Sequence, residues 1–220
     1  MPRDVANEFL PTPDVGLELG AQRLRHARLK RLVDIVGALA GLLLTAPFLL
    51  VVAFCIWVES PGPVIFRQRR TGKDGRPFQI YKFRTMRVFE DGSKVVQAAR
   101  HDRRITRVGA MLRRTSIDEF PNLINVLKGE MSLVGPRPHA LAHDQYYAAS
   151  VADYDERFRT KPGITGLAQV SGFRGETAEV RAMAARVDKD VEYIRNWSNV
   201  LDLKILLKTL SVVAFHPSAY

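Results

Sequence analysis

The longest apolar run in the sequence lies near the N-terminus, where residues 35–58 contain no charged side chain. At about 1.5 Å per residue, an α-helix of this length is just long enough to cross the hydrocarbon core of a bilayer. Pro47 lies near the middle of the run, where it removes one backbone hydrogen bond and clashes with the carbonyl group of Leu43. We therefore predict a helix with a sharp bend at Pro47, in which the Thr45 hydroxyl satisfies part of the freed backbone.

Basic residues flank this run on both sides. Residues 23–31 contain five Lys or Arg side chains, and residues 67–76 contain five more. Short positive flanks stay on the cytoplasmic side of a membrane, so matching charge at both ends favours a re-entrant helix that enters and leaves by one face. A spanning helix is the alternative, because proline also occurs in spanning helices, and a buried helix of a soluble protein is a third interpretation.

Shorter patterns follow the apolar run. Two β-rich runs, 64–68 and 78–83, flank a loop that contains Asp74-Gly75, which is typical of a β-hairpin. We expect a polar loop followed by a basic helix in residues 90–112, and an amphipathic segment in residues 140–158. Two further helices are expected in residues 178–196 and 201–215. The last helix mixes leucines with charges, so it suits the core or a membrane interface. The predicted fold class is mainly α with a small β-hairpin, in a monotopic membrane protein with a re-entrant, Pro-kinked N-terminal helix and amphipathic interface helices.

These patterns divide the chain into three parts. Residues 1–22 contain three prolines and no sustained periodicity, so we expect a disordered tail. Residues 23–60 form the basic amphipathic segment and the re-entrant membrane helix. Residues 61–220 form one cytoplasmic domain, and the hydrophobic content of the whole chain, 46%, is ample for a packed core.

Composition narrows the choice of partners. The chain has 33 Lys and Arg against 23 Asp and Glu, a formal net charge of +10, which favours nucleic acid, phosphorylated small molecules or an anionic membrane surface. Residues 23–31 lack the interleaved aromatic residues of a nucleic-acid surface, and their leucines suit a lipid headgroup layer. Cys55 is the one cysteine in the sequence, which excludes an internal disulfide framework and a cysteine-rich zinc site.

Two adjacent carboxylates, Asp118 and Glu119, lie within a basic stretch, residues 113–138. Ser116 followed three residues later by Glu119 is a capping-box pattern, and Asp118 is an alternative helix cap. In both cases the pair lies at a helix N-terminus, where free N–H groups and the helix dipole favour a bound phosphate. Acidic residues in a first helical turn also serve stability alone, so capping without chemistry is the competing interpretation.

The loop at residues 159–177 combines Pro162 and four glycines with Arg174, a backbone of the kind that approaches a ligand closely. The sequence contains neither a strand followed by GxGxxG nor a P-loop, which argues against these two nucleotide sites. His139 and His143 have the i,i+4 spacing of zinc ligands. Because no companion ligand motif lies nearby, we do not expect a zinc site there.

Five motifs occur in the order of one enzyme family: GPVIFRQRRTG, PFQIYKFRTM, TSIDEFPNLINVLKGEMSLVGPRP, KPGITGLAQVSG and DVEYIRNW with LDLKILLKT. Through these motifs, residues 31–209 resemble the bacterial polyprenyl-phosphate sugar-1-phosphate transferases, the monotopic phosphoglycosyl transferases. The GFRGET and DVEYIRNW segments are most similar to the glucose- or galactose-1-phosphate branch.

The resemblance implies an enzyme that transfers a hexose-1-phosphate from a UDP-sugar to undecaprenyl phosphate, with Mg²⁺, and releases UMP. Such an enzyme works among the lipids of the bacterial inner membrane, at the cytoplasmic face, in the first membrane step of exopolysaccharide, capsule or O-antigen synthesis. Residues 61–220 then form the catalytic domain. Asp118 matches the family's nucleophile, which forms a covalent phosphosugar intermediate, and Glu119 matches its magnesium ligand. The basic, phosphate-facing positions of the family match Lys82, Arg113, Arg137 and Arg174.

Two features depart from the family pattern. Ala46 precedes Pro47 where relatives often have serine, which leaves Thr45 as the nearby hydroxyl. Longer relatives also carry spanning helices and a nucleotide-fold domain, so this chain resembles the catalytic module alone. The competing function is a non-enzymatic, membrane-anchored basic module that binds nucleic acid or anionic lipid, which gives no reason for a carboxylate pair among basic residues. The oligomeric state stays open, a homo-oligomer included.

Overall fold

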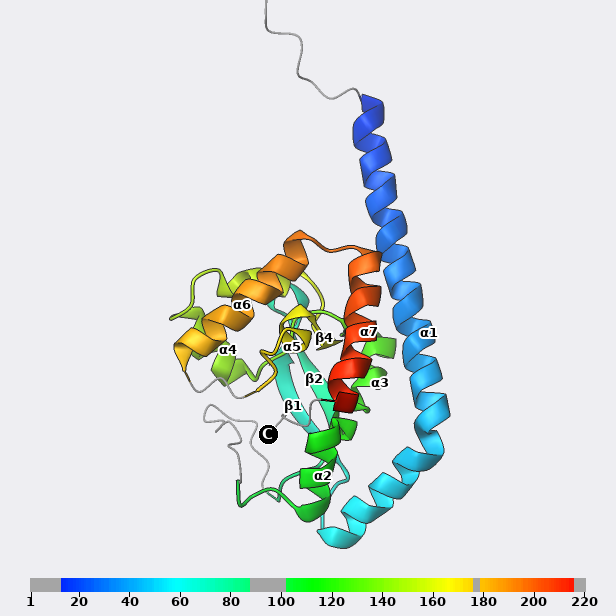
Figure 1. The fold of residues 1–220 in the computed structure, drawn as a ribbon, viewed down its shortest axis with the longest axis vertical. Coiled ribbons are helices and arrows are strands. Elements are labelled where there is room, and N and C mark those ends of the chain that lie inside the picture. Colours follow the sequence, from blue (N-terminus) through cyan, green and yellow to red (C-terminus); the bar gives the residue numbers. More distant parts are fainter. Residues whose placement is uncertain (1–12, 88–101, 176–178, 216–220) are drawn as a thin grey trace, which may run out of the picture.

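The computed structural model describes residues 13–87, 102–175 and 179–215, and it is mainly helical with two small sheets (Figure 1). Its α-helices are α1 (Pro13–Glu59), α2 (Arg107–Thr115), α3 (Asn122–Lys128), α4 (Leu141–Ala148), α5 (Leu167–Val170), α6 (Val180–Arg195) and α7 (Asn199–Phe215). Its strands are β1 (Ile65–Thr71), β2 (Pro77–Phe83), β3 (Ser132–Val134) and β4 (Gly163–Thr165). Three 3₁₀-helices complete it: η1 (Lys73–Gly75), η2 (Ile117–Glu119) and η3 (Tyr154–Arg159). The predicted mainly helical class is confirmed.

The predicted β-hairpin is also confirmed. β1 and β2 pair antiparallel, with Ile65 opposite Phe83 and Thr71 opposite Pro77. Asp74 and Gly75 have positive φ angles of 57° and 73°, which these residue types tolerate and which reverse the chain between the strands. β2 packs against both η2 and α3, so the hairpin places its side chains next to the carboxylate pair.

The second sheet was not predicted. β3 and β4 pair in parallel, with Ser132 opposite Gly163 and Val134 opposite Thr165. The two segments pack so closely that a Cβ atom on Gly163 would clash with the backbone of Gly135. Three-residue strands give no detectable alternation, and their pairing is non-local. This pairing brings the segment that contains Arg137 beside the glycine-rich loop.

Helix α1 begins earlier than the sequence pattern predicts. Residues 1–12 of the predicted disordered tail lie outside the described residues, but 13–22 are helical. Pro13 stands at the first helical position, where its missing N–H costs little, and extending an existing helix adds one hydrogen bond per residue fixed. The lack of apolar periodicity therefore did not prevent helix formation.

Figure 1 shows α1 running along the domain and then changing direction in its C-terminal part. Pro47 lies inside this helix. The Thr45 hydroxyl donates to the carbonyl oxygen of Gly41 at 2.6 Å, and not to the Leu43 carbonyl that Pro47 leaves without its helical partner. Thr45 thus bonds to a carbonyl group two residues earlier in the helix than predicted.

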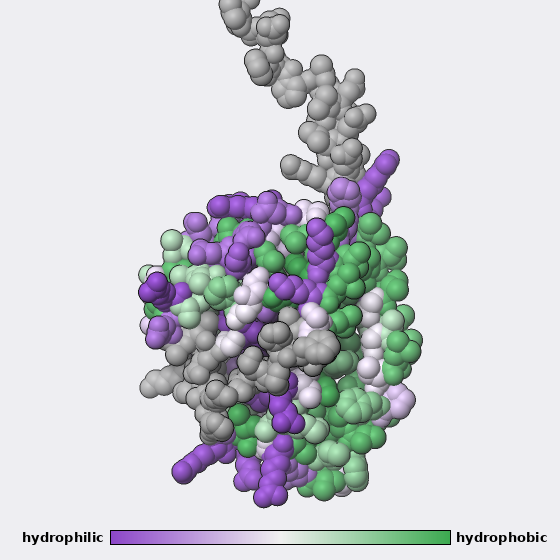
Figure 2. Space-filling model, viewed as in Figure 1, coloured by the Kyte–Doolittle hydropathy of each residue, from purple (hydrophilic) through white to green (hydrophobic). Residues whose placement is uncertain are grey.

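Much of α1 is apolar and exposed. The helix is long and apolar enough over Arg25–Glu59 to cross a membrane, by length and composition, and 11% of its most apolar window is buried. Figure 2 shows apolar residues gathered over α1, along one side of the molecule. Exposed apolar side chains of α1 and α7 form what we call the apolar band: Leu39, Leu43, Leu44, Phe48, Leu50, Val51, Phe54, Trp57 and Val58 with Val200, Leu203, Leu207 and Leu210.

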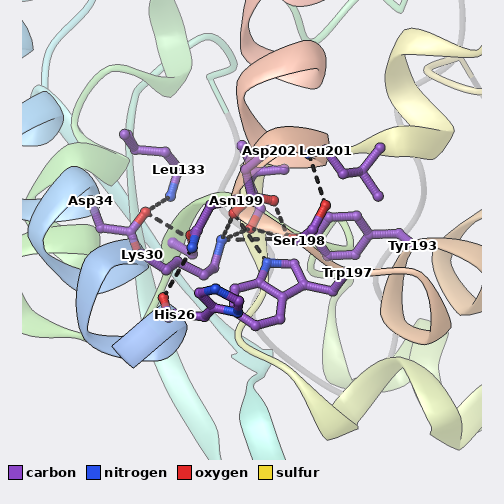
Figure 3. A network of polar contacts seen from close by, with 12 residues as sticks. His26, Lys30, Asp34, Leu133, Tyr193, Trp197, Ser198, Asn199, Leu201 and Asp202 are labelled. Carbon is purple, nitrogen blue, oxygen red and sulfur yellow. Dashed lines mark hydrogen bonds and ion pairs between the residues drawn. The ribbon is translucent and has the colours of Figure 1, made fainter. Parts of the chain in front are cut away.

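The other face of α1 is fixed to the domain by buried polar contacts (Figure 3). Lys30 Nζ donates to Asp202 Oδ2 at 2.7 Å, and Asp202 also accepts from Tyr193 Oη at 2.7 Å and Trp197 Nε1 at 3.2 Å. One turn further along α1, Asp34 Oδ1 accepts from the backbone N–H of Leu133 at 2.8 Å. These contacts tie α1 to α7 and to β3, so the apolar band has a fixed position relative to the rest of the fold.

We predict that Asp202→Asn destabilises the protein by about 3 kcal/mol, because Lys30 would keep a largely buried charge without its partner. Thermal unfolding in detergent measures the effect. Asp188→Asn, on the exposed face of α6, is the matched control and should change stability by less than about 0.5 kcal/mol. Equal small changes for both variants would show that the Lys30–Asp202 pair does not hold α1 in place.

Candidate active site

The carboxylate pair lies in a tight connection between two helices. Ser116 ends α2 in the left-handed conformation, with φ 59°, and Asp118 and Glu119 follow in the single 3₁₀ turn η2. The predicted capping box is wrong, because the Ser116 side chain makes no capping hydrogen bond and Glu119 bonds to other partners. The left-handed residue turns the chain so sharply that the Ser116 hydroxyl cannot lie over the turn that it would cap. Asp118 is not the cap of α3 either, since Pro121 occupies that position.

Glu119 is buried, and two cations from distant parts of the chain bind it. Lys82 Nζ from β2 donates to Glu119 Oε1 at 2.7 Å. Arg137 donates through Nη2 to Oε1 at 2.6 Å and through Nη1 to Oε2 at 3.1 Å, a bidentate pair. The structure therefore brings together three of the residues singled out in the sequence: Lys82, Glu119 and Arg137.

These contacts fix the charge of Glu119. Burial opposes its ionisation, but the charges and hydrogen bonds of Arg137 and Lys82 outweigh burial and hold the pKa of Glu119 well below its usual value. Burial also lowers the pKa of Lys82, an effect that the neighbouring Glu119 partly offsets. Glu119 is consequently a permanent anion at neutral pH.

Asp118 differs from its neighbour. Its side chain is half-buried, and burial raises the pKa of Asp118 to about 6, although Lys82 acts in the opposite direction. Glu119 contributes to the rise through like-charge repulsion. Burial therefore outweighs the nearby cations Lys82, Arg137 and Arg113, which favour the anionic form of Asp118. At pH 7 Asp118 is still mostly ionised, as a carboxylate without the strong hydrogen bonds that occupy Glu119.

The two remaining predicted arginines lie in different positions. Arg113, in the last turn of α2, places Nη1 3.8 Å from the sulfur of Met86, and its charge acts on Asp118. Arg174 lies in the loop after α5. Within the described residues it forms no hydrogen bond or ion pair with Asp118 or Glu119. Arg113 thus belongs to the surroundings of the pair, whereas Arg174 is contributed by a separate loop.

A magnesium ion would find a suitable ligand in Glu119. A carboxylate has about four acceptor positions, and three on Glu119 are used by Lys82 and Arg137, which leaves one on Oε2. In the described part of the chain, no group of three His, Cys, Asp or Glu residues gathers into a complete metal site. Mg²⁺ is commonly held by one or two carboxylates plus phosphate oxygens and water, so the residues present fit an ion that arrives with a phosphorylated substrate.

Several buried polar residues near the site were not predicted as functional. His139, considered only as a zinc ligand, places its two ring nitrogens against Arg157 and Arg186, in surroundings that repel a metal cation. Arg157 donates through Nη2 to the carbonyl oxygen of Arg137 at 2.7 Å. No local pattern in the sequence marks these side chains, because their partners lie far away along the chain. The high density of charged residues in 153–161 is a signal for Arg157, but His139 and Arg186 lie outside that segment.

Asp118→Asn should stabilise the folded protein at pH 8 and not at pH 4. The folded-state pKa of about 6 exceeds the ordinary value of 3.8, so ionising Asp118 costs the folded state free energy as pH rises between these values. Asparagine removes this cost, so the free energy of unfolding should increase by about 1–3 kcal/mol at pH 8. Thermal unfolding at both pH values measures it, with Asp188→Asn as the exposed control. A gain of equal size at pH 4, or a loss at pH 8, would contradict the raised pKa.

Comparison with known proteins identifies relatives over most of the chain. The family model for bacterial sugar transferases matches residues 25–216. A UDP-glucose:undecaprenyl-phosphate glucose-1-phosphate transferase of Caulobacter vibrioides is 53% identical over 191 residues, which cover 87% of this chain and 72% of that protein. The protein of the same name from Escherichia coli is 50% identical over 192 residues, 87% of this chain and 41% of that protein. An exopolysaccharide production protein of Rhizobium leguminosarum is 48% identical over 186 residues, 83% of this chain and 93% of that protein.

This chain therefore spans less than half the length of the Escherichia coli relative. The match nevertheless includes the apolar helix, the carboxylate pair, the glycine-rich loop and both C-terminal helices. Since the family model covers nearly the whole chain and the relatives are about half identical to it, the chain belongs to the bacterial sugar transferase family.

Proposed function

We propose that the protein transfers glucose-1-phosphate from UDP-glucose to undecaprenyl phosphate and releases UMP, at the start of exopolysaccharide synthesis. The observation that carries this proposal is the buried Glu119 held by Lys82 and Arg137, beside the more weakly held Asp118. The names of the relatives support the donor and the acceptor. Relatives named for N-acetylgalactosamine and galactose are less similar, at 40% and 42% identity, which favours glucose over these sugars.

Asp118 is the nucleophile in this proposal. One of its carboxylate oxygens attacks the sugar-side phosphorus of the donor, and the bond from that phosphorus to the bridging oxygen breaks, so that UMP leaves with the electron pair. An oxygen of the lipid phosphate then attacks the same phosphorus and displaces the Asp118 carboxylate. A pKa of about 6 makes Asp118 ionised at neutral pH, and burial leaves it less solvated than a surface carboxylate.

In the proposed reaction, Glu119 binds the metal ion, and Lys82 and Arg137 hold Glu119 in place. Held by three hydrogen bonds, Glu119 cannot turn toward phosphorus, and its remaining acceptor position on Oε2 is available to Mg²⁺. Bound Mg²⁺ would supply neutralisation of the diphosphate charge. Lys82 and Arg137 contribute positive charge beside Glu119, and Arg113 contributes it beside Asp118. Arg174 contributes positive charge to the donor phosphates from the loop after α5.

The apolar band supports a location at the membrane. We propose that α1 enters the cytoplasmic face of the inner membrane and bends at Pro47 to return to the same face, with α7 in the interface. The exposed band and the basic residues on both sides of the apolar run support this topology. Because Lys30 and Asp34 fix α1 to the domain, the acceptor lipid and the soluble donor would meet at one surface.

UMP release from UDP-glucose tests the proposed function directly. The wild-type protein with undecaprenyl phosphate and Mg²⁺ should release UMP, and Asp118→Asn should abolish release, because an amide is neither charged nor nucleophilic. Glu119→Gln should lower the rate by about 10²-fold or more and recover partly as Mg²⁺ is raised, since a weakened ligand needs more metal. Asp188→Asn is the matched surface control.

Two outcomes would contradict this assignment. If Asp118→Asn keeps more than about a tenth of wild-type release, Asp118 is not the nucleophile. If no UDP-sugar in a panel yields UMP from the wild-type protein in the presence of acceptor lipid, the protein is not a sugar-1-phosphate transferase and the membrane-anchored binding module becomes the better account.

The membrane topology is tested by cysteine labelling in vesicles or intact cells. The native Cys55, which is exposed on α1, is first replaced by serine. Single cysteines at Arg28 and Arg76, both exposed, should then react with an impermeant reagent from the cytoplasmic side only. Labelling of these two positions from opposite sides would show a spanning helix instead. Pro47→Ala should increase any spanning fraction, because it restores a straight helix.

A further inference from the structure

A buried polar network lies beside the proposed active site and takes no direct part in the proposed chemistry. It joins η3, α4 and α6 to the segment that follows β3. Its buried members are His139, Asp144, Tyr154, Arg157, Arg186 and Asp190. Burying two arginines is costly, and an apolar core of the same shape would stabilise the fold as well or better. The contacts of these arginines therefore indicate what else the network provides.

Arg157 holds the backbone of Arg137. Its side chain is 3% exposed, and its Nε donates to Asp190 Oδ2 at 2.9 Å, which neutralises the buried charge. The free end of the guanidinium donates through Nη2 to the carbonyl oxygen of Arg137 at 2.7 Å. Since Arg137 in turn binds Glu119 in bidentate geometry, a shift of its backbone would move both of those hydrogen bonds.

Arg186 has an equivalent relation to Arg174. From α6 it donates through Nε to the carbonyl oxygen of Phe173 at 2.9 Å and through Nη2 to that of Gly175 at 2.6 Å. These two carbonyl groups lie on either side of Arg174. Among the described residues, a Cβ atom on Gly172 or Gly175 would meet no neighbour. Arg186 thus holds the backbone of this open loop at the residue before Arg174 and at the residue after it.

His139 connects the two buried arginines. Its Nδ1 lies 3.0 Å from Arg157 Nη1 and 2.8 Å from Tyr154 Oη, and its Nε2 lies 3.3 Å from Arg186 Nη1. Burial, followed by the charges of Arg157 and Arg186, holds the pKa of His139 well below its usual value. The imidazole ring is therefore neutral, and it lies between the guanidinium groups of Arg157 and Arg186.

We propose that Arg157 and Arg186 are positioning residues, which set Arg137 and Arg174 respectively on the diphosphate of the UDP-sugar. This inference rests on the proposed function and deepens it. It assigns two arginines to the substrate and two buried arginines to their backbones, with His139 as the link. Neither Arg157 nor Arg186 touches the substrate in this arrangement.

Conservative substitutions test the two positions separately. Arg157→Lys keeps a cation for Asp190 but cannot also reach the Arg137 carbonyl, so kcat should fall about 10–100-fold with a smaller change in KM. Arg186→Lys cannot bond two carbonyl groups in the same way, so the KM for UDP-glucose should rise about tenfold with a smaller change in kcat. Arg195→Lys, at an exposed position on α6, is the matched control and should change neither constant.

Double-mutant cycles distinguish positioning from general stability. If Arg157 acts through Arg137, Arg157→Lys should have no further effect on kcat in an Arg137→Gln background, and Arg186→Lys should have none on KM in an Arg174→Gln background. UDP affinity measured by calorimetry in the Arg174 cycle gives a second measurement that needs no turnover. If the fold-changes of the single variants multiply in full in both double variants, and the lysine variants also unfold at a lower temperature, the role of Arg157 and Arg186 is purely structural. That result would overturn the proposal.

The wild-type measurement separates this inference from the function on which it rests. A wild-type protein that releases no UMP from any UDP-sugar overturns the proposed function, and this inference with it. If the wild-type protein is active but the effects in both double-mutant cycles are independent, only the positioning role is wrong, and the proposed function is retained.

Discussion

The proposed active site depends on the neutralisation of one buried carboxylate. Without partners, Glu119 would take up a proton rather than remain charged at 9% exposure. Lys82 and Arg137 prevent this, and they come from β2 and from the segment after β3. The charge of Glu119 therefore requires that the hairpin, η2 and the β3–β4 pair all be in place.

The same constraint separates the two carboxylates. Lys82 and Arg137 direct their hydrogen bonds at Glu119, so Asp118 experiences burial without the same compensation, and the pKa values of the two side chains move in opposite directions. Two adjacent residues of nearly the same chemistry thereby become a fixed anion and a titratable one. This division suits a metal ligand beside a nucleophile.

A second set of buried charges connects the long apolar helix α1 to the domain. Lys30 and Asp34 on one face of α1 bond to α7 and β3, while the opposite face presents the apolar band to the surroundings. β3 continues directly into the segment that contains Arg137. Asp34 of α1 is thus joined through β3 to the segment that contains Arg137. In the proposed function, this arrangement would bring the acceptor lipid and the soluble donor to one surface.

The sequence predicted what local patterns encode. The hairpin followed from two β-rich runs around Asp74-Gly75, and the long apolar helix followed from its lack of charge. The geometry at Ser116 could not be predicted, because its left-handed backbone lies at the junction where α2 packs against η2, and no sequence pattern encodes that packing. These contacts of Arg157 and Arg186 join residues 11 to 33 positions apart, and no sequence periodicity indicates such pairs. The resemblance to a family singled out Lys82, Arg137 and Glu119, but as phosphate-facing cations and a metal ligand, so it did not predict that both cations bind Glu119.

The central claim is that Asp118 becomes covalently bonded to the sugar phosphate. Mass spectrometry of the protein incubated with UDP-glucose and Mg²⁺, without acceptor lipid, tests this claim most directly. The account predicts an added hexose phosphate that maps to Asp118 and disappears when undecaprenyl phosphate is supplied. Full turnover with no adduct, or an adduct that persists in Asp118→Asn, would contradict it.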